Sequence, residues 1–95
     1  MKFPNGKYSR DWNDPRYKEF RRAVLKRDRY KCQFPQCGSR LKLQVHHIIK
    51  WASNFLLRFK VGNGITLCRK HHDKIKGKEG CYVELFLTII NNKSL

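Results

Sequence analysis

The fold of this chain is decided by residues 45–72, which read VHHIIKWASNFLLRFKVGNGITLCRKHH. This stretch holds all four histidines of the protein in two doublets, His46-His47 and His71-His72, with Asn63 between them. Imidazole changes its protonation near neutral pH and is a common metal ligand. The sequence therefore predicts that the two doublets and Asn63 build a metal-assisted site.

A frame of cysteines encloses most of this stretch. Cys32 and Cys37 form one pair, and Cys68 with His71 forms a second pair roughly thirty positions later. Such spacing is typical of a structural zinc site with four tetrahedral nitrogen or sulfur ligands. If a helix begins near Cys68, His71 lies on the same face as Cys68, whereas His72 is rotated by about 100°. We therefore expect zinc to bind Cys32, Cys37, Cys68 and His71 and to leave His72 for other chemistry.

The fourth cysteine, Cys81, has no paired ligand nearby, and we expect it to be a small buried apolar residue. The alternative is a secreted peptide with two disulfides, for example Cys32 to Cys37 and Cys68 to Cys81. The residues after Met1 contain no apolar signal region, which favours a reducing, cytoplasmic location over secretion.

The chain is short and strongly basic. Its 95 residues fit one domain, whose core would be marginal without a staple such as zinc. The 22 Lys and Arg against 7 Asp and Glu give a net charge of +15, which predicts nucleic acid as the partner. No apolar run approaches the roughly 18 to 20 residues that span a bilayer, so we expect no membrane segment.

An irregular basic arm is expected over residues 1–13, followed by a helix from Asp14-Pro15 to about Asp28. Aspartate is a favourable N-cap, and proline suits the first helical position. The expected apolar stripe consists of Tyr17, Phe20, Val24 and Leu25. A second face carries the basic residues that we expect to contact the phosphates of DNA, namely Lys18, Arg22, Lys26 and Arg29.

Alternation of Leu41, Leu43 and Val45 with polar residues predicts a strand that ends at the first doublet. In a regular strand His46 and His47 point to opposite faces. For both to reach one metal ion, the chain has to turn at or just after the doublet. Residues 51–62 are expected to form a long connection with a short helical turn, and its apolar residues to cover the core: Trp51, Phe55, Leu56 and Phe59.

The second half of the chain is expected to return along the first strand. Residues 62–64, Gly-Asn-Gly, indicate a turn, and residues 65–67 a second, antiparallel strand. A helix is predicted from Cys68 to about Lys78, with Lys70 and Lys74 facing DNA. The spacing of apolar residues from Tyr82 to Ile90 predicts a final amphipathic helix against the core.

These elements in this order resemble the HNH endonuclease family from about Tyr30 to Glu79, and most of all the small free-standing HNH proteins of bacteriophages and introns. The segments that carry the resemblance are CQFPQC at 32–37, VHHII at 45–49, NGITLC at 63–68 and the second doublet. The resemblance implies an α+β fold. It consists of a ββα-metal core over about residues 41–79 with a zinc-binding frame, flanked by an N-terminal and a C-terminal helix within a single domain, 14–95.

The resemblance also implies a role for each residue. His47 matches the general base, His46 and His72 match ligands of a catalytic Mg²⁺ or Mn²⁺, and Asn63 braces the loop or touches that ion. One departure is His71, which stands where the family more often has a fourth zinc cysteine. Neutral imidazole can take a proton from water at physiological pH, and one divalent ion can act as Lewis acid on the phosphate. The lack of paired carboxylates between residues 29 and 72 argues against a two-metal carboxylate nuclease.

The function implied is a metal-dependent endonuclease that nicks double-stranded DNA. It would act as a monomer or dimer in a bacterial or phage-infected cell, in the company of other phage DNA-processing proteins. The alternative is a zinc-stabilised DNA-binding module without catalysis. That alternative leaves the histidines and Asn63 unexplained as a set.

Overall fold

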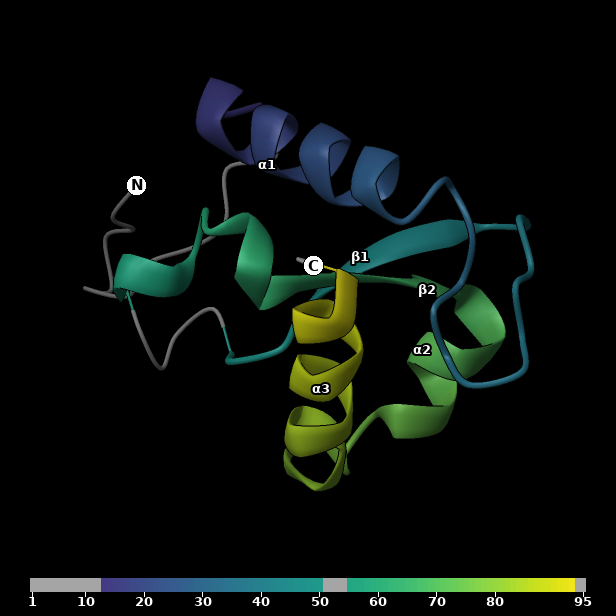
Figure 1. Ribbon diagram of the computed structural model, residues 1–95. Helices are drawn as coiled ribbons and strands as arrows, with labels where there is room; N and C mark the ends of the chain where they lie inside the picture. Colours follow the sequence, from purple (N-terminus) through teal and green to yellow (C-terminus); the bar gives the residue numbers. More distant parts are fainter. Residues whose placement is uncertain (1–12, 51–54, 94–95) are drawn as a thin grey trace.

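The structure is a computed structural model that describes residues 13–50 and 55–93. The helices and strands follow in the order α1 (Pro15–Arg27), β1 (Leu43–His47), β2 (Gly64–Cys68), α2 (Arg69–Ile75) and α3 (Val83–Lys93) (Figure 1). Short 3-10 turns are η1 (Phe55–Leu57), η2 (Val61–Asn63) and η3 (Glu79–Tyr82). Most of the predicted basic arm and Trp51 lie outside the described residues. The elements confirm the expected small α+β fold.

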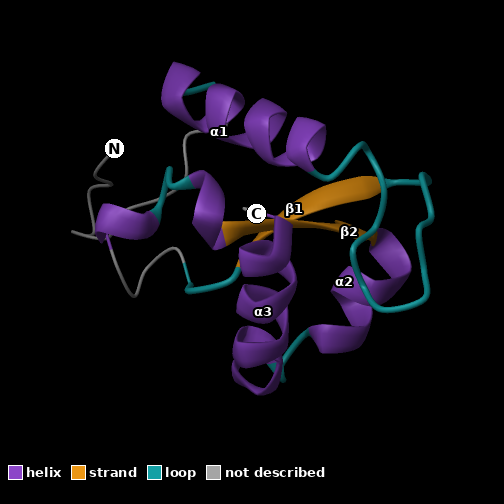
Figure 2. Ribbon diagram, in the orientation of Figure 1, coloured by secondary structure: helices purple, strands orange, loops and turns teal. Residues whose placement is uncertain are grey.

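The two strands form an antiparallel hairpin at the centre of the molecule. Leu43 pairs with Cys68 at one end, and His47 pairs with Gly64 at the other. In Figure 2, α1 crosses one side of the hairpin, while α2 and α3 lie on the opposite side. Two clusters of buried side chains match this division, so each face of the hairpin has a core of its own.

Helix α1 begins and packs as its sequence predicts. The Asp14 side chain accepts a hydrogen bond from the Arg16 amide at 2.8 Å, and Pro15 occupies the first turn. The buried side chains of the helix are Tyr17, Phe20, Val24 and Leu25, which confirms the predicted stripe. Phe20 and Val24 pack with Val45 and Phe59 in the cluster on this face, which we call the α1-side core.

The end of α1 carries an ion pair between neighbouring residues, and hydrogen bonds from this pair join the helix to β2. Sequence patterns did not predict it. Nε and Nη2 of Arg27 each donate to the Asp28 carboxylate at 2.8 Å, and the same guanidinium donates to the carbonyls of Val61 and Gly64 at 2.8 and 2.6 Å. The carboxylate of Asp28 accepts a further bond from the Thr66 amide at 2.9 Å. Asp28 is only 1% exposed, so these bonds compensate for the burial of its charge.

The opposite face carries the larger cluster, which we call the metal-side core. Its buried members come from β2, the connecting loops, α2 and α3: Cys32, Ile48, Ile65, Leu67, Cys68, Ile75, Phe86 and Ile90. Helix α3 contributes Phe86 and Ile90, as the amphipathic spacing predicted. Helix α2 ends at Ile75, earlier than the expected Lys78, because Gly77 adopts a left-handed φ of +78°.

Three expectations about apolar residues were wrong. Leu41 is 76% exposed and lies before β1, because Lys42 has a φ of +49° that interrupts the extended backbone. Leu56 is also 76% exposed, so it does not cover the core, whereas Phe59 packs into the α1-side core. Cys81 is exposed on η3, whereas its neighbour Tyr82 packs against the metal-side core.

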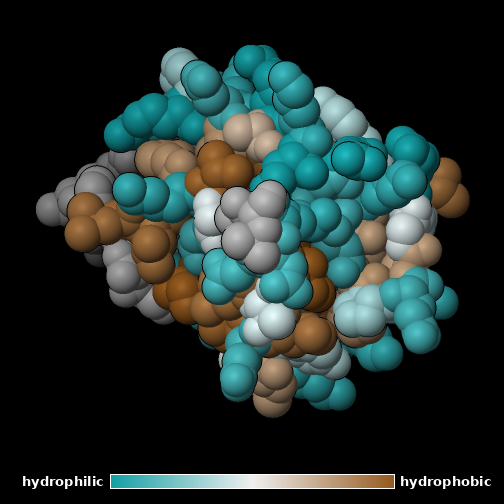
Figure 3. Space-filling model, viewed as in Figure 1, coloured by the Kyte–Doolittle hydropathy of each residue, from teal (hydrophilic) through white to brown (hydrophobic). Residues whose placement is uncertain are grey.

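The surface of the described residues is largely hydrophilic over α1, at the top of Figure 3. Among helices within residues 13–50 and 55–93, none combines the length and apolarity required to cross a bilayer.

Candidate metal centre and histidine site

The four side chains predicted to bind zinc converge at one end of the hairpin. The sulfur atoms of Cys32, Cys37 and Cys68 and one ring nitrogen of His71 all lie within 4.8 Å of one another. Cys32 and Cys37 belong to the loop between α1 and β1, Cys68 ends β2, and His71 lies on α2. Within the part of the chain that the structure describes, this is the one group of three or more such ligands.

The spacing of these atoms fits a tetrahedral zinc ion. Sulfur and nitrogen bind zinc at about 2.3 and 2.05 Å, so tetrahedral neighbours lie about 3.8 Å apart for two sulfurs and about 3.6 Å apart for sulfur and nitrogen. Cys37 Sγ lies 3.9 Å from Cys68 Sγ. His71 Nδ1 lies 3.7 Å from Cys32 Sγ and 3.4 Å from Cys68 Sγ. The donor set of three thiols and one imidazole is also that of closed structural zinc sites.

Local backbone turns point the first two cysteines inward. The Cys32 amide donates to the Ser39 carbonyl at 2.8 Å, and the Cys37 amide donates to the Phe34 carbonyl at 3.0 Å. Gly38 has a φ of +72°, a conformation in which glycine is not strained. The Phe34 ring stacks on the imidazole of His71, with 4.2 Å between ring centroids and 2° between ring planes. This stack fixes the orientation of the histidine ring.

Burial and hydrogen bonds shift the protonation of the cluster. Burial raises the pKa of the Cys32 thiol to about 12. Burial also acts to raise the pKa of Cys68, but hydrogen bonds from the His71 amide and from the other two thiols outweigh it, and that pKa is lowered. Burial, followed by the charges of Lys70 and Lys74, lowers the pKa of His71. The imidazole of His71 is therefore neutral at neutral pH, which is the form that binds a metal.

The second histidine doublet divides between two sites. While His71 faces the cysteines, the ring centroid of His72 lies 5.9 Å from that of His46. The His46 ring also packs edge-on against Phe86 of α3, at 5.8 Å between ring centroids. Two imidazoles bound to one ion have ring centroids within about 6 Å, because each nitrogen lies about 2.1 Å from the metal. The residues of this pair therefore fit a shared divalent ion.

His47 lies on the other face of the hairpin. Its ring stacks on Phe20 of α1, at 4.8 Å between ring centroids and 15° between planes. The strand continues through His47 and the chain bends directly afterwards, at residues 48 and 49. The bend agrees with the expectation, but the two side chains of the first doublet still contact opposite layers. The structure thus brings His46 to His72 and places His47 against α1.

A backbone carbonyl determines which nitrogen of His47 is basic. Nε2 of His47 lies 2.8 Å from the carbonyl oxygen of Arg58. Since a carbonyl only accepts hydrogen bonds, Nε2 carries the hydrogen and Nδ1 carries the lone pair. His47 is 4% exposed, and its ring is held between this carbonyl and Phe20.

Asn63 braces the loop between the two strands. Its Oδ1 accepts from the Ile49 amide at 2.8 Å, and its Nδ2 donates to the carbonyls of Ile49 and Leu57 at 3.0 and 3.2 Å. Leu57 directly precedes Arg58, whose carbonyl holds His47. Of the two roles expected for Asn63, these contacts match loop bracing.

The six predicted DNA contacts lie on two elements. Lys18, Arg22 and Lys26 are exposed on α1, and Arg29 follows it. Lys70 and Lys74 are exposed on α2, on the other side of the hairpin (Figure 1). The structure therefore does not gather all six into one surface. Sequence reasoning also left out Arg21, an exposed cation on α1 three residues after Lys18 and therefore on the same side of the helix.

One comparison with known proteins finds a family. A family model described as HNH endonuclease matches residues 32–75. The matched segment contains every residue of the predicted zinc cluster, both histidine doublets and Asn63. No curated protein and no solved structure matches the chain significantly.

Proposed function

This chain belongs to the HNH endonuclease family through residues 32–75, and from that premise we propose that it is a metal-dependent nuclease that nicks double-stranded DNA. The family gives the general class of reaction, hydrolysis by a nuclease. The observation that supports catalysis in this chain is the pair of His46 and His72 on one face of the hairpin, whose rings lie close enough to share an ion. The substrate and the roles below are part of the proposal.

His46 and His72 would hold the catalytic Mg²⁺ or Mn²⁺. Their ring centroids are 5.9 Å apart, and they come from β1 and α2, which the hairpin and the zinc cluster hold together. When bound, the ion supplies Lewis-acid stabilisation to the scissile phosphate and its leaving oxygen. Cys68 lies directly before α2, and His71 lies in its first turn. Zinc bound by both residues would therefore fix the orientation of this end of α2 and of His72.

His47 acts as the general base in this proposal. In the neutral imidazole Nδ1 carries the lone pair, which can take a proton from water at physiological pH. This nitrogen is buried in the structure, so substrate binding would have to open a path to it. Because His46 and His47 contact opposite layers, the scissile phosphate would lie at the end of β1, where both faces of the strand are within reach. The Arg58 carbonyl stabilises the imidazolium that forms when Nδ1 is protonated.

Asn63 is a positioning residue for this base. It holds the carbonyl of Leu57 and both backbone groups of Ile49. These bonds set the loop on which the Arg58 carbonyl lies. Replacement of Asn63 by alanine should therefore lower the rate of nicking without changing the affinity for the divalent ion.

The test is the nicking of supercoiled plasmid by zinc-loaded protein with Mg²⁺ or Mn²⁺. His47→Ala should keep the fold and remove nicking, while His72→Ala should raise the metal concentration required for half-maximal nicking. Lys76→Gln, an exposed lysine outside the histidine site, is the matched control. Nicking by His47→Ala at the wild-type rate would refute its role as the base.

A second candidate function is a zinc-stabilised DNA-binding module without catalysis. The observation that favours it is the position of His47, which contacts α1 instead of the His46 and His72 pair. The same assay decides between the two functions. Binding of plasmid by the wild-type chain, with no nicked product at any concentration of Mg²⁺ or Mn²⁺, would establish the module.

A further inference from the structure

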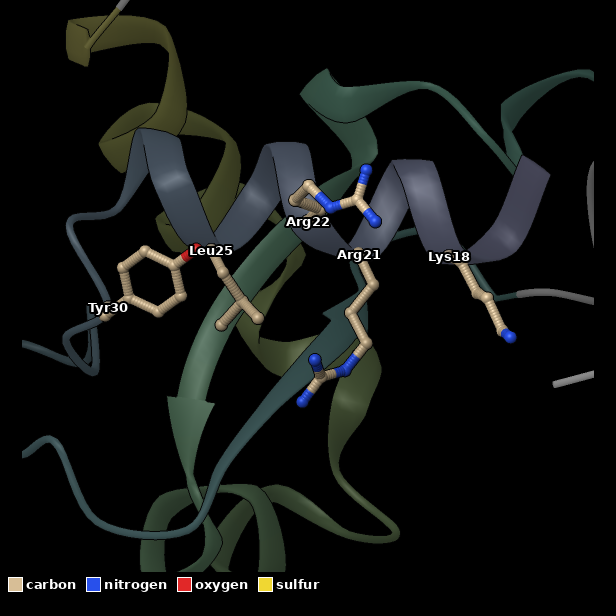
Figure 4. Close-up of a pocket in the computed structure, with 5 residues that line it drawn as sticks. All are labelled: Lys18, Arg21, Arg22, Leu25 and Tyr30. Carbon is tan, nitrogen blue, oxygen red and sulfur yellow. The ribbon is translucent and has the colours of Figure 1, made fainter. Parts of the chain in front are cut away.

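A pocket on α1 combines three cations with an exposed aromatic ring. It has a volume of about 330 Å³ and is lined by Lys18, Arg21, Arg22, Leu25 and Tyr30 (Figure 4). No acidic residue is part of this described lining. The volume lies near the lower end of the range for small-ligand pockets.

Tyr30, which supplies the aromatic ring, is unusual in its exposure and in its backbone conformation. Tyr30 is 47% exposed, although most large apolar side chains of the described residues are buried or half-buried. Its φ is +55°, and the preceding Arg29 has a φ of +57°, a region that non-glycine residues seldom adopt. The Tyr30 amide donates to the Leu25 carbonyl at 2.9 Å, which closes the end of the helix and holds the ring beside it.

The aromatic and apolar side chains lie at one end of this pocket, and cations lie toward the other end. In Figure 4 the Leu25 side chain lies between the Tyr30 ring and Arg21, and Lys18 lies farther along the helix. Leu25 is 5% exposed and forms the apolar base of the pocket. A flat ligand with negative charges on one side would match this order of ring, apolar base and cations.

We propose that this pocket binds an unpaired nucleotide of a DNA strand, with its base against Tyr30 and Leu25 and its phosphates near Lys18, Arg21 and Arg22. Proteins hold single strands by stacking bases on aromatic rings while cations follow the backbone. In an intact duplex the base faces are covered by neighbouring base pairs, so they cannot stack on Tyr30. The proposal rests on the proposed function only in taking DNA as the partner, and it specifies DNA with unpaired positions.

The experiment measures fluorescence anisotropy of a labelled thymidine 12-mer and of a duplex of equal length, with zinc-loaded protein and without Mg²⁺ or Mn²⁺. Tyr30→Asn removes the ring, and asparagine tolerates a positive φ. It should weaken single-strand binding about tenfold at every salt concentration without changing the salt slope. Tyr30→Phe should bind like the wild type. Arg21→Gln should reduce the slope of log K against log salt by about 0.7.

A base analogue provides a readout that does not depend on a variant. The fluorescence of 2-aminopurine within the single strand should fall on binding, because stacking quenches it. Unchanged fluorescence, or equal affinity of Tyr30→Asn and wild type, would overturn the proposal and leave α1 as a contact for duplex phosphates. Plasmid nicking is a separate measurement. Single-strand binding without nicking therefore refutes only the proposed catalysis, and nicking without any effect of Tyr30 refutes only this pocket.

Discussion

The two faces of the hairpin are stabilised by different means. On the α1 side, Phe20 and Val24 pack on the strands, and the buried pair of Arg27 and Asp28 fastens the helix with side chains that the chain itself supplies. On the metal side, the core includes two of the four residues that converge in the candidate zinc cluster. The comparison teaches that, within the described residues, potential metal ligands join the core of one face only.

The same division runs through the histidine site. His46 belongs to the metal side, together with His72 and Phe86, while His47 belongs to the α1 side, together with Phe20. Consequently the proposed ion depends on the zinc cluster, and the proposed base depends on the packing of α1. Each face can be weakened separately, and the following changes do so in order of decreasing expected effect.

Loss of a zinc ligand should have the largest effect. Cys37→Ser should release zinc and unfold the domain, because zinc binding contributes on the order of 10 kcal/mol to the folding of small zinc domains. Zinc content and circular dichroism on heating measure this. Cys81→Ser is the matched control, since Cys81 is exposed and lies outside the cluster. An unchanged melting temperature of Cys37→Ser would show that the metal side folds without zinc.

Removal of the buried charge on the α1 side should come next. Asp28→Asn weakens the ion pair with Arg27 and leaves that guanidinium partly uncompensated, which should lower the free energy of unfolding by about 3 to 5 kcal/mol. Urea unfolding of zinc-loaded protein is the measurement, and zinc content should not change. The control is Asp73→Asn, whose exposed pair with Arg69 spans 3.7 Å and should contribute less than about 1 kcal/mol. Similar losses in both variants would contradict the importance of the α1-side pair.

A methyl group between α1 and the hairpin tests how tightly that face is packed. A Cβ at Gly64 would lie 2.6 Å from Cγ2 of Val24 and 2.8 Å from Cζ of Phe20. Gly64→Ala should therefore destabilise the protein by about 1 to 3 kcal/mol. It should also slow nicking, because Phe20 stacks on His47. Gly62→Ala, where a Cβ meets nothing within 4 Å, should do neither.

The smallest effect is expected in the connection between the strands. Leu56→Ser should change stability by less than about 0.5 kcal/mol, because this side chain is 76% exposed and belongs to neither core. Phe59→Ser removes a ring from the α1-side core and should be clearly worse in the same urea titration. An equal loss of stability in Leu56→Ser and Phe59→Ser would contradict the exposure of Leu56 and show that its side chain is packed.

Much of the fold follows from periodicity along the chain. The buried stripe of α1, the antiparallel strands and the buried residues of α3 match their predicted positions, because apolar spacing reports directly which face of an element is covered. Errors occurred where one backbone angle changed the outcome, as at Lys42 and Gly77. The exposure of Leu56 could not be predicted either, since a hydrophobic residue in a loop carries no periodic signal.

The candidate site was predicted unevenly for similar reasons. Ligand spacing indicated the zinc cluster, because the geometry of the metal restricts which residues can meet. The bond from His47 to the Arg58 carbonyl and the pocket at Tyr30 have no such signature. The bond of His47 depends on a loop from another part of the chain, and the pocket depends on the positive φ of Arg29 and Tyr30 at the end of α1.

The sequence by itself determined the elements of this protein, the set of potential metal ligands and the strongly basic charge, because each depends on residue type and local spacing. Only the tertiary structure decided which side chains contact His46 and which contact His47, and that the Arg27 and Asp28 pair joins α1 to β2. These features depend on how separate elements pack. Packing is set by burial and by hydrogen bonds between residues far apart in the chain, which no local pattern encodes.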